Sequence, residues 1–219
     1  MNRKIKTLIF IVLFGTVMLS NVIAQEVTRI DLPEPVMSGG KPLMDVFKSR
    51  CSQRSFSNQE LTLQSISNLL WAANGINRPD SKKRTAPTAM NDQEIEVYLA
   101  NKDGVYVYLP EEHAIELVES GDLRGKFGIQ GFVKDAPVIL IYVADYKKMS
   151  SLMSKEDKDF YAATDVGFVS QNVYLFCASE GLATVVLGMV SRDSAAKSIN
   201  LDSGKKIMLT QCVGYPLEK

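Results

Sequence analysis

Residues 137–144 read P-V-I-L-I-Y-V-A and contain no charged side chain. A strand with one face in water alternates apolar and polar residues, whereas a strand covered on both faces is apolar throughout. The run is therefore predicted to be a central strand of a sheet that is covered on both sides.

The segments around this strand mix helical and extended patterns. Residues 63–73 carry apolar residues at helical spacing, with Thr62 as a capping residue and Asn74-Gly75 as a stop. Asp103-Gly104 has the chemistry of a tight hairpin turn. The other expected elements are helices over residues 43–49, 113–119, 156–180 and 193–199, strands over 95–100, 105–109, 183–187 and 207–213, and a long polar loop over 76–94. Helices and strands follow one another without regular alternation, which favours an α+β domain with a largely antiparallel sheet.

The N-terminal 24 residues have the pattern of a secretory signal peptide. A basic start precedes an apolar run from Leu8 to Leu19, and Ala24 supplies the small residue before the expected cleavage point. The run is too short for a membrane-spanning helix. We therefore expect a periplasmic or secreted protein without membrane insertion, with residues 25–42 as an extended leader and residues 43–219 as one domain.

Charge and cysteine content exclude several function classes. Residues 1–24 carry three of the 25 basic residues and none of the 25 acidic ones, so the remaining chain has a formal charge of −3. Such a balance gives no indication of nucleic-acid binding. Three cysteines are too few and too far apart for a disulfide framework or a zinc site. Cys177 and Cys212 are expected in the core, whereas the sequence does not assign Cys51 to the core or to the surface. The single histidine, His113, is expected at the surface.

The stretch from Arg50 to Phe56 reads R-C-S-Q-R-S-F and is the candidate binding segment. In an extended conformation Arg50, Ser52 and Arg54 share one face, because side chains two residues apart point the same way. Guanidinium groups offer paired donors that match phosphate oxygens. The row therefore suits a phosphorylated ligand, although a solvated basic edge has the same pattern.

Several stretches occur together in the order that is typical of one family. They are R-C-S-Q-R-S-F at 50–56, L-L-W-A-A-N-G-I-N at 69–77, R-T-A-P-T-A-M-N-D-Q at 84–93, D-V-G-F-V-S-Q-N-V-Y-L-F-C-A-S-E-G-L at 165–182, V-V-L-G at 185–188 and V-G-Y-P at 213–216. In these motifs the chain resembles the FMN-dependent nitroreductase superfamily. Within that superfamily it is most similar to the branch that includes the thiazole/oxazole-forming dehydrogenases. The resemblance covers residues 43–216 and implies an intertwined homodimer with an FMN site between subunits.

The resemblance also implies roles for individual residues. Arg50 and Ser52 match residues that hold the FMN phosphate and ribityl chain, and Arg54 matches a basic residue that reaches toward the pyrimidine side of the flavin. Leu187 and Gly188 match a segment whose backbone lies beside the reactive edge of the flavin. The loop that covers the ring of the other subunit's flavin is matched by Pro87, Thr88, Ala89 and Asn91. No catalytic side chain and no metal ligand is expected, since the flavin carries the hydride chemistry.

The resemblance implies an exported FMN-dependent oxidoreductase that reduces a small organic acceptor in a two-step exchange, with NAD(P)H as one possible electron donor. A non-catalytic dimer that binds flavin or another small ligand is the alternative. The sequence departs from the family pattern at Cys51, where relatives often have a second arginine. It also has only Lys219 where many relatives have a basic tail.

Overall fold

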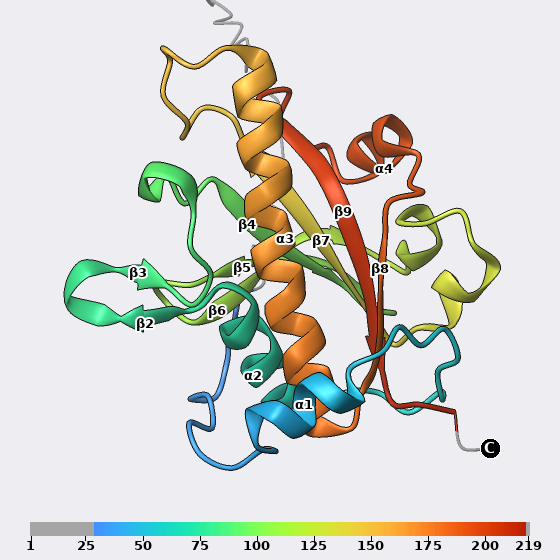
Figure 1. Ribbon diagram of the computed structural model, residues 1–219. Coiled ribbons are helices and arrows are strands. Elements are labelled where there is room, and N and C mark those ends of the chain that lie inside the picture. Colours follow the sequence, from blue (N-terminus) through green and yellow to red (C-terminus); the bar gives the residue numbers. More distant parts are fainter. Residues whose placement is uncertain (1–28, 218–219) are drawn as a thin grey trace, which may run out of the picture.

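The computed structural model describes residues 29–217 and has a seven-stranded sheet at its centre (Figure 1). The strand order is β1-β6-β5-β4-β7-β9-β8, and every neighbouring pair is antiparallel. The strands are β1 (Arg29–Asp31), β4 (Ile95–Ala100), β5 (Gly104–Leu109), β6 (Ala114–Ser120), β7 (Val138–Asp145), β8 (Ala183–Leu187) and β9 (Lys205–Gly214). The antiparallel α+β fold predicted from the sequence is confirmed. The expected signal peptide and residues 25–28 of the leader lie outside the described residues.

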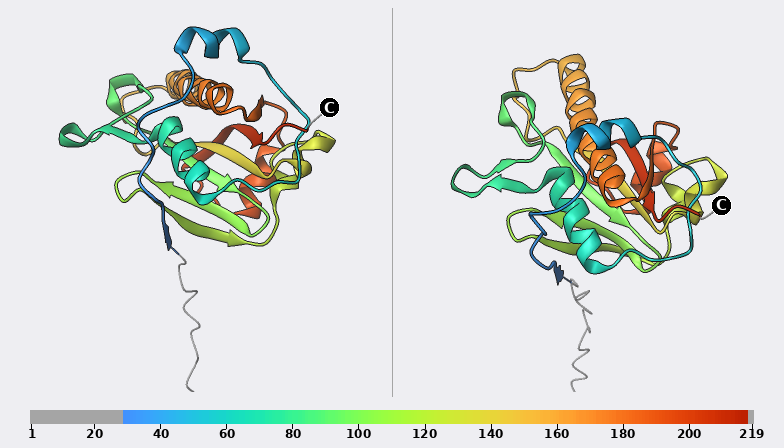
Figure 2. Two further views of the ribbon diagram at one scale, coloured as in Figure 1. Left: turned by 90° about the horizontal axis from the view of Figure 1, so that it is seen from below. Right: turned by 60° about the horizontal axis from the view of Figure 1, so that its bottom comes forward.

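Helices pack on both faces of this sheet. They are α1 (Leu43–Ser49), α2 (Leu63–Asn74), α3 (Lys155–Glu180) and α4 (Arg192–Ser198). The helices α1, α2 and α3 lie on one side, and α4 lies on the other, as the view along the sheet shows (Figure 2). All eight residues of β7 are buried. Their side chains alternate between the two cores: Leu140 and Tyr142 pack with α2 and α3, and Ile139 and Ile141 pack with α4. The prediction of a strand covered on both faces is confirmed.

The long helix α3 has well-defined ends. The Ser154 side chain accepts a hydrogen bond from the Asp157 N–H at the first turn, and Gly181 follows the last turn in the left-handed conformation with φ 73°. With 26 residues the helix is about 39 Å long. It can therefore place side chains at widely separated points of the same sheet face.

Two predicted segments have a different structure. Residues 113–119 were expected to be helical, but His113 lies in a turn and the rest belong to β6, which pairs with β5 on one side and with β1 on the other. The apolar residues of this segment fit the period of a strand once it pairs in register with β5, so tertiary pairing decides the structure. The expected loop 76–94 contains a small hairpin of β2 (Ile76–Arg78) and β3 (Lys83–Arg84). It also contains two 3₁₀ turns, η1 (Pro79–Ser81) and η2 (Ala89–Asn91).

His113 does not point freely into solvent, contrary to the sequence expectation. Its ring is half-buried, with Nδ1 2.9 Å from the Tyr108 hydroxyl and Nε2 2.7 Å from Ser67 Oγ and 3.1 Å from the Pro33 carbonyl oxygen. Because a carbonyl only accepts, Nε2 carries the proton and Nδ1 accepts from Tyr108. His113 thereby joins β6, α2 and the chain after β1, and burial lowers the pKa of His113 below its ordinary value of 6.5.

This arrangement predicts a loss of stability in acid. The unfolded chain takes up a proton at His113 near pH 6.5, while the folded protein resists it, so the stabilising contribution is present above pH 6.5 and is lost as the pH falls through the folded pKa. H113Q keeps an acceptor and a donor but does not titrate. We expect the free energy of unfolding in urea to fall more for the wild type than for H113Q between pH 7.5 and pH 5. Parallel pH profiles of the two proteins would contradict this.

Candidate cofactor-binding site

The Arg50–Phe56 segment runs from α1 along β8, without forming a regular strand. The Gln53 N–H donates to the Thr184 carbonyl at 2.9 Å, and Phe56 forms an isolated bridge with Pro216 beyond β9. Residues 51–55 remain exposed. The backbone is thus held against the sheet while the candidate side chains face outward.

Tyr174 of α3 connects this segment with β8. Its hydroxyl accepts the Val186 N–H at 3.0 Å and lies 2.9 Å from Ser52 Oγ. Either hydroxyl can be the donor of this bond; when Tyr174 donates, the serine proton is left for another acceptor. The guanidinium carbon of Arg50 lies 5.4 Å from the centre of the Tyr174 ring, a cation–π distance. One side chain therefore orients both Arg50 and Ser52.

The two arginines of the segment are available for an anion. Among residues 29–217, neither Arg50 nor Arg54 forms an ion pair with a carboxylate. Cys51 and Gln53 line a separate cavity of ≈ 160 Å³ beside Cys177, and Cys51 is a free exposed thiol. An arginine side chain next to a serine hydroxyl is a common arrangement in phosphate-binding sites.

Leu187 and Gly188 lie at the far end of β8. Leu187 is buried and Gly188 is exposed. Arg192 at the start of α4 donates to the carbonyl oxygens of Gly188 at 3.2 Å and Met208 at 2.8 Å, which fixes the turn after the strand. Gly188 follows Val186, the residue bonded to Tyr174, by two residues, which is about 7 Å along a strand. The charged segment and the exposed turn thus lie along one strip beside β8.

The Pro87–Asn91 loop lies at a different place on α3. Its Ala89 N–H donates to Asp165 Oδ2 at 2.9 Å. Asp165 precedes Tyr174 by nine residues, which corresponds to about 13 Å along the helix axis. The structure therefore brings Arg50 and Ser52 to the strand that ends at Leu187 and Gly188, and holds Pro87, Thr88, Ala89 and Asn91 apart from them within one chain.

The sequence argument missed Tyr174 and Arg192 as supports of this site. The ring of Tyr174 is buried in the packing surface of α3. Its hydroxyl is the functional part, because it reaches Ser52 and Val186. Nothing in the local sequence shows which backbone groups lie opposite Tyr174 or Arg192, so no pattern of spacing could have identified them.

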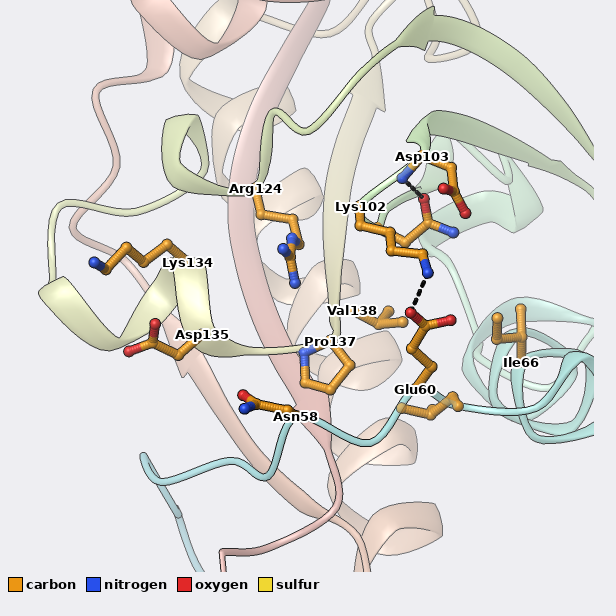
Figure 3. Close-up of a pocket in the computed structure, with 12 residues that line it drawn as sticks. Asn58, Glu60, Ile66, Lys102, Asp103, Arg124, Lys134, Asp135, Pro137 and Val138 are labelled. Carbon is orange, nitrogen blue, oxygen red and sulfur yellow. Dashed lines mark hydrogen bonds and ion pairs between the residues drawn. The ribbon is translucent and has the colours of Figure 1, made fainter.

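A second cavity of ≈ 250 Å³ lies near the β4–β5 turn (Figure 3). Its charged side chains are engaged with the protein itself: Lys102 pairs with Glu60, and Arg124 pairs with Asp122 and donates to the Ala136 carbonyl. None of its lining residues belongs to the Arg50–Phe56 segment or to the Gly188 turn. Because Lys102 and Arg124 are already engaged in ion pairs, we assign no ligand to this cavity.

Among residues 29–217, no helix combines the length and apolar character needed to cross a membrane. No group of three or more histidine, cysteine, aspartate or glutamate side chains there could hold a metal ion.

Comparisons with known proteins agree with this geometry. The nitroreductase family model matches residues 47–215. A protein of Methanocaldococcus jannaschii named "Putative nitroreductase" is 34% identical over 157 residues, covering 67% of this chain and 78% of that protein. The "NADPH-flavin oxidoreductase" of Vibrio harveyi is 29% identical over 97 residues, covering 41% of this chain and 40% of that protein. A crystal structure from Ralstonia eutropha, also named "putative nitroreductase", has a TM-score of 0.83 and 38% identity over 87% of this chain and 90% of that one. The chain belongs to the nitroreductase family.

Proposed function

We propose that this protein is an FMN-dependent oxidoreductase that works as a homodimer. The observation that carries the proposal is the position of Tyr174, which holds Arg50 and Ser52 against β8 at Val186, two residues before the exposed Gly188 turn. FMN has a phosphate at one end and a ring system at the other, joined by the ribityl chain. The strip along β8 matches this arrangement of charge.

The residues of the strip have distinct tasks. Arg50 and the free proton of Ser52 bind the phosphate, and Arg54 brings positive charge toward the flavin pyrimidine, where it stabilises the anionic reduced form. Arg192 holds the Gly188 carbonyl, so the backbone of this turn keeps a fixed direction beside the ring. Gly188 has no side chain to cover the ring, and a Cβ there would meet only Leu209 Cδ2, at 3.8 Å. Bound FMN supplies two-electron transfer between donor and acceptor.

A second copy of the chain completes the site in this proposal. The Pro87–Asn91 loop contacts α3 about 13 Å along the helix from Tyr174, and in this proposal it covers the flavin of the partner subunit. The same face carries exposed apolar side chains: Phe160 and Phe168 of α3, and Leu43, Met44 and Phe47 of α1. Exposed apolar groups in such number are typical of a protein–protein interface.

The physiological setting belongs to the same proposal. The N-terminal signal pattern supports export to the periplasm or beyond, where the acceptor is a small organic molecule. The motif order supports a place near the thiazole/oxazole-forming dehydrogenases. The NADPH-flavin oxidoreductase relative supports a nicotinamide donor, while an exported enzyme would need a donor outside the cytoplasm, such as a periplasmic electron carrier.

Removing both arginines tests the phosphate site. A charge-assisted hydrogen bond contributes about 1.5–3 kcal/mol, so each arginine accounts for about 10- to 100-fold in affinity. We expect R50A/R54A to purify without FMN and to bind added FMN at least about 100-fold more weakly in a fluorescence titration. R29A, at the exposed edge strand β1, is the matched control and should bind like the wild type. Unchanged FMN content in R50A/R54A would remove the phosphate site from the proposal.

The role of the Tyr174 hydroxyl can be separated from that of its ring. Y174F retains the ring under Arg50 but leaves the half-buried Val186 N–H without its acceptor, which costs about 1 kcal/mol. We therefore expect a lower free energy of unfolding together with weaker FMN binding. Y161F changes an exposed tyrosine on the same helix and should change neither quantity. A fully stable Y174F with wild-type affinity would show that this hydroxyl does not position Ser52.

Reduction of the bound flavin distinguishes an enzyme from a binding protein. We expect the purified yellow protein to lose its flavin absorbance anaerobically with NADH, NADPH or a quinol, and to regain it on addition of an acceptor such as a nitroaromatic compound. A colourless protein that takes up no FMN would refute the proposal. A yellow protein that none of these donors reduces would instead favour a flavin-binding dimer without turnover.

A further inference from the structure

The loop between Pro87 and Gln93 is held in a strained conformation. Met90, Asn91 and Gln93 all have positive φ angles, of 52°, 60° and 50°. Asparagine tolerates this region, but methionine and glutamine adopt it at a cost, and such conformations persist only where surrounding contacts enforce them. The loop therefore depends on the groups that hold it.

Two hydrogen bonds supply this support. Thr88 Oγ1 accepts the Gln93 N–H at 3.1 Å, which closes the loop on itself. Asp165 Oδ2 accepts the Ala89 N–H at 2.9 Å, which joins the loop to α3. Asp165 is 2% exposed, so its carboxylate is removed from water. The second contact is the one that places the loop relative to the rest of the molecule.

Glu94, the residue after this loop, lies beside Asp165 in a chemically unusual state. Its side chain is 0% exposed, and among the described residues no hydrogen-bond donor reaches either carboxylate oxygen, whereas the Asp165 carboxylate lies within hydrogen-bonding reach. A buried ionised carboxylate without partners is strongly unfavourable. Burial first, and then the neighbouring Asp165 and Asp92 carboxylates, raise the pKa of Glu94 to about 7.

No cation on the neighbouring elements compensates these acids. The guanidinium of Arg84 on β3 is turned to Gln93 Oε1 and the Asn74 carbonyl. On β7, the carboxylate of Asp145 is turned away and accepts the Lys147 N–H. The carboxyl groups that face Glu94 are therefore Asp165 from α3 and Asp92 from the loop.

We infer that Glu94 and Asp165 share one proton, and that this shared proton allows Asp165 to hold the strained Pro87–Gln93 loop in place. Protonated Glu94 donates to the Asp165 carboxylate, which still accepts the Ala89 N–H through Oδ2. Loss of the proton leaves two buried like charges in contact, which repel each other and release the loop. Glu94 and Asp165 are thus positioning residues for the loop that covers the flavin, and this inference rests on the proposed function.

The inference predicts FMN binding that weakens as the pH rises. A loop that is competent only with Glu94 protonated passes from mostly competent to about one-tenth competent between pH 6 and pH 8, so the apparent dissociation constant for FMN rises about tenfold. The phosphate of FMN titrates near pH 6 as well, so the wild type is compared with E94Q. The amide of E94Q donates to Asp165 at every pH, and this variant should lack the tenfold change.

Two further variants test whether the pH dependence of FMN binding comes from the Glu94–Asp165 pair. In D165N the amide oxygen accepts the Ala89 N–H and the amide nitrogen donates to ionised Glu94, so binding should again be independent of this proton. E96Q is the matched control on the same strand: Glu96 pairs with Lys148 and Lys205 outside the cluster. It should retain the wild-type pH dependence. A wild-type profile in E94Q, or loss of the pH dependence in E96Q, would overturn the inference.

Unfolding of the flavin-free protein provides a readout that does not need FMN. The folded state retains the Glu94 proton up to about pH 7, whereas the unfolded chain loses it near pH 4.5. Stability from this group is therefore full below pH 4.5 and is lost as the pH rises through 7. Relative to E94Q, wild-type stability should fall between pH 5 and pH 8. Equal destabilisation of E94Q at both pH values would mean that Glu94 is ionised and held by a cation, which contradicts the shared proton.

Failure of the wild type to bind FMN at any pH would instead refute the proposed function. The unfolding free energies of the wild type and E94Q would still test the shared proton in that case.

Discussion

The packing of α3 across one face of the sheet is the constraint on which the candidate site depends. The helix contributes buried residues to the core between α2 and β7, and its caps at Ser154 and Gly181 fix where it begins and ends. Asp165 and Tyr174 are its two buried polar contacts with functional segments. Because both lie on one rigid helix, the loop after Thr85 and the segment after α1 are positioned by the same element, about 13 Å apart.

The contacts of Tyr174 and Asp165 have different structural effects. Tyr174 joins groups that belong to one strip along β8, so it assembles a site within the chain. Asp165 holds a loop away from that strip, which suits a loop that serves a neighbouring molecule. The same spacing that separates these segments in one subunit therefore supports the exchange of site residues between two. The buried Glu94 adds a condition to the second contact, since Asp165 can hold the loop only if the pair is not doubly charged.

Much of the fold could be predicted because the relevant signals are local. The apolar run of β7, the Thr62 cap and Asn74-Gly75 stop of α2, and the Asp-Gly turn each specify their own element. Residues 113–119 could not be assigned in the same way, since their strand conformation comes from pairing with β5, and His113 is buried by contacts from Ser67 and the chain after β1. Within the site, the Arg50–Arg54 row was visible in the sequence. The roles of Tyr174, Arg192 and Glu94 depend on neighbours far along the chain and required the structure.

The position of the Arg50–Phe56 segment has a consequence for how the protein behaves in solution. β8 is an edge strand, and such an edge offers unpaired backbone groups to which strands of other molecules can add. Here the outward carbonyl of Thr184 is taken by the Gln53 N–H, and the outward N–H of Val186 is taken by Tyr174. The segment that carries Arg50 and Arg54, together with Tyr174, thus also occupies backbone groups of this edge strand to which a strand of another molecule could otherwise add.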